Sequence, residues 1–122
     1  MPVKYRFDAN IVVIEMIGEY TLNDIRTTIL NSLADSAHIA NSFLLIDFSK
    51  SKSIYNRTSE EIQIMSNFLG SVGTRFSNRI ALVGPDDLKF GLLRMGSVGS
   101  EDRGVKSNVF RTFAEARKWL LA

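Results

Sequence analysis

The sequence predicts a single α/β domain in which helices cover a largely parallel β-sheet. Two short segments, residues 43–46 and 80–83, are apolar on both faces, as expected for strands in the middle of such a sheet. Amphipathic segments with helical spacing lie between and after the predicted strands. This alternation along the chain is typical of parallel sheets with right-handed crossovers.

The chain begins with a predicted β-hairpin. Residues 3–8 alternate between apolar and polar side chains, which indicates a strand with one wet face at the edge of a sheet. Residues 8–10, Asp-Ala-Asn, have the composition of a turn. Residues 11–17 form the next strand, so we expect the first two strands to pair in antiparallel fashion.

Three helical segments open with a threonine followed three residues later by an acidic residue, the pattern of a capping box. The pairs are Thr21 with Asp24, Thr58 with Glu61, and Thr112 with Glu115. A fourth helix is expected to begin near Asp86, and a glycine-rich loop follows it at residues 96–104. With a weaker strand at 107–110, the predicted order is ββαβαβαβα, a mixed, mostly parallel five-stranded sheet in one domain over residues 1–122.

Composition excludes several classes of function. The chain has no cysteine, which excludes disulfides, thiolate catalysis and sulfur-bound zinc. Its single histidine, His38, cannot build a multi-histidine metal site, and no metal or cofactor is expected. A net charge of +2 without a dense basic patch argues against a nucleic-acid partner.

The distribution of apolar residues predicts a cytoplasmic protein without a membrane span. The longest aliphatic or aromatic runs, residues 11–14 and 43–46, fall far short of the roughly 20 residues that cross a bilayer. Charged side chains begin at Lys4, too early for the apolar region of a signal peptide.

Three segments carry a family resemblance: FLLIDFS at 43–49, RIALVG at 79–84 and VFRTFAEARKWL at 109–120. With the order of elements, they resemble the STAS domains of bacterial anti-sigma-factor antagonists, the SpoIIAA-like family, in a divergent STAS-like branch. The resemblance implies a SpoIIAA-like fold and a non-catalytic regulatory module that binds a protein partner. It also implies an alternative, a carrier or sensor of a small lipophilic ligand.

The phosphorylated serine of the antagonists lies in a motif like D-S-S-G-L-G, from which this chain departs. After residues 47–49 the sequence continues KSKSIYNRTSEEIQIM, without an Asp-Ser-Ser-Gly. The nearest hydroxyl groups at the start of the following helix belong to Thr58 and Ser59. These two residues are therefore the candidates for a phosphorylated position.

Ligands of open parallel sheets usually bind beyond the carboxyl ends of the strands, where helix N-termini also gather. We expect a binding site for a partner or ligand at this edge. The candidate residues are Asp47, Ser49, Ser51, Ser53, Tyr55, Arg57, Thr58, Ser59 and Asp86, with Lys50 and Lys52 as further cations. The alternative is a solvated loop with helix caps, in which Asp47 and Asp86 bind nearby backbone N–H groups.

A second candidate site is apolar, beneath the 96–104 loop. Its residues are Met65, Phe68, Phe90 and Met95, since methionine adapts to irregular ligands. The alternative is that these side chains are core, because they lie on helix faces that must pack.

Three functions follow from these patterns: a protein-binding regulatory module, a small-molecule carrier or sensor, and an enzyme. An enzyme needs a nucleophile, a base and an orienting group in one place, and the sequence offers no such set. His38 is expected at the opposite edge of the sheet, after the first long helix. A homodimer is a further expectation, since a second copy would cover the sheet if the helices gather on one face.

Overall fold

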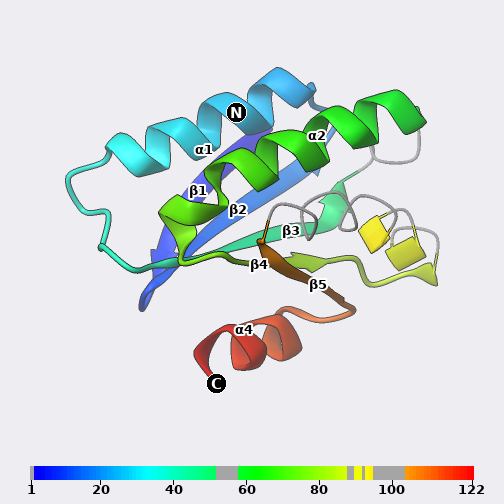
Figure 1. The fold of residues 1–122 in the computed structure, drawn as a ribbon. Helices are drawn as coiled ribbons and strands as arrows, with labels where there is room; N and C mark the ends of the chain where they lie inside the picture. Colours follow the sequence, from blue (N-terminus) through cyan, green and yellow to red (C-terminus); the bar gives the residue numbers. More distant parts are fainter. Residues whose placement is uncertain (1, 52–57, 88–89, 92, 95–103) are drawn as a thin grey trace.

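Five strands form one mixed sheet in the order β1-β2-β3-β4-β5 (Figure 1). The computed structural model describes residues 2–51, 58–87, 90–91, 93–94 and 104–122. The strands are β1 (Val3–Asp8), β2 (Ile11–Gly18), β3 (Phe43–Ser51), β4 (Arg79–Val83) and β5 (Lys106–Phe110). The β1–β2 pair is antiparallel and the other pairs are parallel, which confirms the predicted hairpin and sheet.

The helices are α1 (Leu22–Ala34), α2 (Ser59–Val72) and α4 (Phe113–Leu121), and a short 3₁₀ turn, η2 (Gly73–Phe76), follows α2. Thr21, Thr58 and Thr112 are their N-caps, and each accepts a hydrogen bond from the backbone N–H three residues later, as predicted. The predicted fourth helix is described in part. Asp87, Phe90, Gly91, Leu93 and Arg94 are helical, and the Phe90 amide donates to the Asp86 carbonyl at 2.9 Å.

The sheet is buried on both faces. Helices α1 and α2 lie on one face and α4 lies on the other (Figure 1). In β2, Val12 and Ile14 belong to the core cluster on the α1/α2 face. Ile11 and Val13 belong to the cluster on the other face, with Ala116 and Leu120 of α4. The apolar part of the second face is thus covered by the chain's own helix α4. The expectation of a homodimer rests on the premise that the helices gather on one face and leave the other uncovered, and this premise does not hold.

Polar and cationic contacts fix α4 on the sheet. Arg117 donates from Nε to Asp8 at 3.0 Å, joining the helix to the β1–β2 turn. The Arg79 guanidinium lies 5.9 Å from the centroid of the Phe43 ring and 5.3 Å from that of Trp119. None of the helices in the described part of the chain is both long and apolar enough to cross a membrane.

We expect the burial of α4 to be measurable with two adjacent leucines. Leu120 is 0% exposed and Leu121 is 40% exposed. Leu120→Ala should lower the free energy of unfolding by about 2–5 kcal/mol, because it leaves a cavity under α4. The matched change Leu121→Ala should cost less than about 0.5 kcal/mol. Urea denaturation measures both, and equal losses would show that α4 does not pack as described.

A second prediction concerns the contact that holds β1 to the end of α1. The Tyr5 hydroxyl donates to Asp35 Oδ2 at 2.6 Å. This bond lowers the pKa of Asp35 from its ordinary value of 3.8, with a further contribution from the Ala37 amide, and it raises the pKa of Tyr5 from 10.0. The lowered carboxyl pKa gives stability above pH 3.8 that is lost as pH falls through the folded-state value. The raised phenol pKa gives stability below pH 10.0 that is lost as pH rises through the folded-state value.

Tyr5→Phe should therefore destabilise the protein most between these two limits. Urea denaturation of both proteins at neutral pH, in acid and in alkali measures the difference. It should shrink at both extremes, and a difference independent of pH would contradict the role given to this bond.

Candidate functional site

The pairing of the neighbouring strands β2 and β3 shifts register at one point, and the candidate site lies at this irregularity. From Glu15 to Ile17 the β2 strand advances by two residues, while β3 advances by three, from Asp47 to Lys50. The extra residue in β3 is a β-bulge, which reverses the alternation of side chains along the rest of the strand. Lys50 pairs with Ile17 and Asp47 with Glu15, so Lys50 and Asp47 come to share the α4 face of the sheet.

Two carboxylates lie next to each other on this face. Glu15 and Asp47 are register partners on neighbouring parallel strands. Arg6 of β1 donates from Nε to Glu15 Oε1 at 2.7 Å. The same guanidinium lies 5.3 Å from the centroid of the Phe113 ring, at the first residue of α4. Glu15 is therefore neutralised by a cation that an aromatic ring helps to position.

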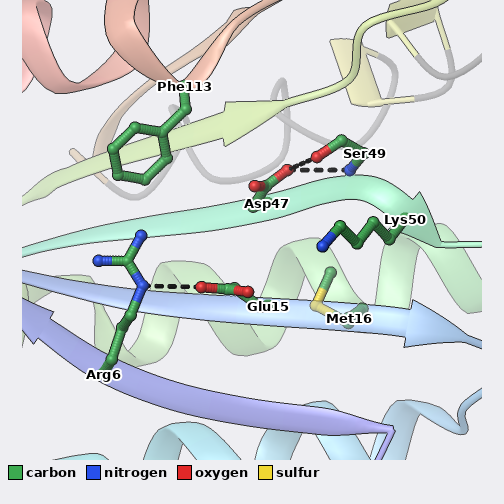
Figure 2. Close-up of a pocket in the computed structure, with 7 residues that line it drawn as sticks. All are labelled: Arg6, Glu15, Met16, Asp47, Ser49, Lys50 and Phe113. Atoms are coloured by element: carbon green, nitrogen blue, oxygen red, sulfur yellow. Dashed lines mark hydrogen bonds and ion pairs between the residues drawn. The ribbon is translucent and has the colours of Figure 1, made fainter.

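These side chains line a polar pocket at the carboxyl ends of β2 and β3, with a volume of about 210 Å³ (Figure 2). The lining residues are Arg6, Glu15, Met16, Asp47, Ser49, Lys50 and Phe113. Figure 2 shows the Lys50 ammonium directed back along the sheet, into the space beside the two carboxylates. Met16 is 1% exposed and belongs to the core on the α1/α2 face, so charged and hydroxyl groups dominate the pocket.

Asp47 fixes the backbone at the bulge. Its Oδ1 accepts a hydrogen bond from the Ser49 amide at 2.9 Å and a second one from the Ser49 hydroxyl. The side chain thus satisfies a backbone donor at the point where the β2–β3 hydrogen-bond ladder is irregular, which is the backbone-binding role expected as the alternative for Asp47. The residue combines this role with a position in the wall of the pocket.

The hydroxyl in the pocket lacks a histidine base. His38, the chain's one histidine, lies at the opposite edge of the sheet, as predicted. Its ring packs edge-on against Phe7 and Phe76, with centroids 6.5 and 6.1 Å apart. Ser49 has a carboxylate beside it instead, in Asp47.

Two other hydroxyls predicted for the site, those of Ser51 and Thr58, have structural partners. Ser51 is 1% exposed and its Oγ lies 2.6 Å from the Tyr20 hydroxyl, because the bulge turns it into the α1/α2 core. Thr58 caps α2: its Oγ1 accepts from the Glu61 amide at 3.1 Å. Ser59 is the first residue of that helix, and Asp86 begins the partly described helix after β4. The candidates Ser53, Tyr55 and Arg57, with Lys52, lie outside the described residues.

The proposed apolar pocket does not join the polar one. Met65, Phe68 and Phe90 are partly buried and pack against the core on the α1/α2 face, whereas the polar pocket opens on the α4 face. These three residues contact the core and are only partly buried, so an apolar site at this place stays a prediction. Met95 lies outside the described residues.

Four residues of the pocket escape prediction from the sequence: Arg6, Glu15, Met16 and Phe113. The predicted β1–β2 hairpin contained the information needed to place Arg6 near Glu15. The turn at residues 8–10 places Arg6 opposite Val13, diagonal to Glu15, and so sets up an ion pair on the polar face. Met16 and Phe113 gave no such signal, because their neighbours are set by the bulge and by the docking of α4.

The acidic residues of the site do not form a metal cluster. Over residues 2–51, 58–87, 90–91, 93–94 and 104–122, no group of three or more His, Cys, Asp or Glu side chains could hold a metal ion. The pair formed by Glu15 and Asp47 already lies beside Arg6 and Lys50, whose positive charges disfavour a bound cation.

Comparisons with known proteins bear on the fold. No family model matches the chain, and no curated protein matches it. Among solved structures, it is similar to an uncharacterized protein of the DUF3478 family from Shewanella loihica PV-4, which has a SpoIIAA-like fold. The superposition has a TM-score of 0.58 at 17% sequence identity and covers 97% of this chain and 91% of the other. The fold predicted from the order of elements and the three sequence segments is confirmed: the chain has a SpoIIAA-like fold.

Proposed function

We propose that the chain is a non-catalytic regulatory module that binds a protein partner through the carboxyl edge of its sheet, on the α4 face. The polar pocket lined by Asp47, Glu15, Arg6 and Lys50 is the observation that carries this proposal. It lies at the edge where open parallel sheets usually bind their ligands. The SpoIIAA-like fold agrees with a role in protein interaction.

The size and polarity of the pocket favour a protein surface over a lipophilic molecule. Pockets for drug-sized ligands have volumes of roughly 300–1,000 Å³ and mostly apolar walls. This pocket, at about 210 Å³, is smaller and lined mainly by charged and hydroxyl groups. An apolar ligand would desolvate these groups without replacing their hydrogen bonds. A partner with complementary charges would pair with them.

The hydrogen bonds of the hydroxyl groups support a role without catalysis. Ser49 donates to Asp47, Ser51 is paired with Tyr20, and Thr58 caps α2. Acyl or phosphoryl transfer needs an activated nucleophile beside a base and an orienting group. These three hydroxyls instead maintain the bulge, the core and a helix end.

Three further expectations remain predictions. The first is a homodimer, which would have to use a surface other than the sheet face that α4 covers. The second is a cytoplasmic location. The third is the phosphorylation of Thr58 or Ser59. A phosphate on Thr58 would lie beside Glu60 and Glu61, whose charges oppose it.

Affinity isolation with matched variants tests the proposal. Asp47→Asn and Lys50→Glu should each lower partner recovery by about fivefold or more, because they remove or reverse a charge at the contact. Glu60→Gln and Lys118→Glu, exposed positions on α2 and at the end of α4, are the controls and should change nothing.

Hydrogen exchange of the isolated complex locates the contact. Slower exchange at the ends of β2 and β3 and at the start of α4 would support the proposal. Protection confined to the α1/α2 face or to the edge around His38 would contradict it. Enzymatic turnover that Asp47→Asn abolishes would contradict the non-catalytic role.

A further inference from the structure

The polar pocket holds hydrogen-bonding groups that its own ion pair leaves unused. Arg6 uses Nε for Glu15, which leaves its two terminal nitrogens. Among the described residues, Asp47 accepts through Oδ1 alone, which leaves Oδ2. Lys50 has no ion-pair partner among the residues that the structure describes, and its ammonium is directed into the pocket (Figure 2).

The charges that face the pocket are balanced. Two cations, Arg6 and Lys50, face two carboxylates, Glu15 and Asp47. A ligand with one kind of charge would therefore meet a like charge on entering. An anion such as phosphate would approach both carboxylates, and a divalent cation would approach Arg6 and Lys50. A ligand that carries an ammonium and a carboxylate a few bonds apart matches both pairs at once.

The arrangement of the groups gives such a ligand an orientation. The carboxylates are side by side across β2 and β3, the Lys50 ammonium lies toward the strand ends, and Arg6 and Phe113 lie on the other side (Figure 2). An ammonium between the carboxylates would leave the ligand's carboxylate facing Lys50. A substituent on the connecting carbon would extend toward the Phe113 ring and the Arg6 guanidinium.

We propose that this pocket binds a free α-amino acid, with its ammonium on Glu15 and Asp47 and its carboxylate on Lys50. A volume of about 210 Å³ is below the range of drug-sized ligands but suits a molecule of this size. The proposal rests on the proposed function in using the same pocket as the recognition site. It adds that a small zwitterion occupies the pocket and competes with the protein partner there.

Calorimetry and amide NMR of the full chain test the proposal with L-alanine, L-glutamine and L-phenylalanine as probes. At least one should bind saturably and shift the amides of Ser49 and Lys50. The N-acetyl and C-terminal amide forms of that amino acid each lose one charge. Each should bind about tenfold more weakly or worse, since a charged hydrogen bond is lost.

Variants of the chain provide the reciprocal test. Lys50→Met and Asp47→Asn should each weaken the binding of the intact amino acid by about tenfold or more. The asparagine side chain of the second variant would keep an oxygen for the Ser49 amide, so the bulge should persist, and the amide spectrum reports whether it does. Lys118→Met and Glu60→Gln are matched controls and should bind as the original chain does.

The outcomes separate this inference from the proposed function. No saturable binding by any probe, binding insensitive to the pocket variants, or shifts confined to other regions would overturn the inference. If partner recovery still depends on Asp47 and Lys50 in that case, the proposed function stands alone. The converse outcome is that the amino acid binds as predicted while Asp47→Asn and Lys50→Glu leave partner recovery unchanged. In that case the pocket is a ligand site and the proposed protein contact is wrong.

Discussion

The requirement that strands β2 and β3 be covered on both faces governs this structure. Residues 11–14 and 44–46 are almost fully buried, which occurs in a parallel sheet only when helices lie on each side. Helices α1 and α2 supply one layer and α4 supplies the other. The docking of α4 has a second effect, because it brings Phe113 over Arg6 at the end of the sheet. The layer that completes the core therefore also supplies one wall of the polar pocket.

The pocket depends on a single extra residue in β3. Regular alternation would send Asp47 and Lys50 to opposite faces, since they are three residues apart. The bulge places both on the α4 face and directs Ser51 to the other, where it meets Tyr20. Bulges often occur beside functional sites because they redirect side chains in this way. Asp47 stabilises the irregular backbone through the Ser49 amide, so one side chain both shapes the pocket and presents a charge to it.

The likeness to the Shewanella protein concerns the backbone, because identity over the matched chain is 17%. Function must therefore be argued from the side chains of this chain. Here they form a small, charge-balanced pocket at the carboxyl edge of the sheet, while the methionine and phenylalanine side chains described on α2 and near β4 are partly buried against the core. This contrast favours recognition of a polar, charged group over storage of a lipophilic one.

The sequence by itself determined the elements and their order. Local signals were sufficient for these: alternation in β1, two-sided apolar runs in β3 and β4, and threonine caps before α1, α2 and α4. It also identified Asp47, Ser49 and Lys50. Only the tertiary structure decided that α4 covers the second face and that Ser51 is buried, and it joined Arg6, Glu15 and Phe113 to the pocket. The physical reason is that a bulge and a helix docking are set by pairing between distant strands and layers, whereas periodicity along the chain reports only local conformation.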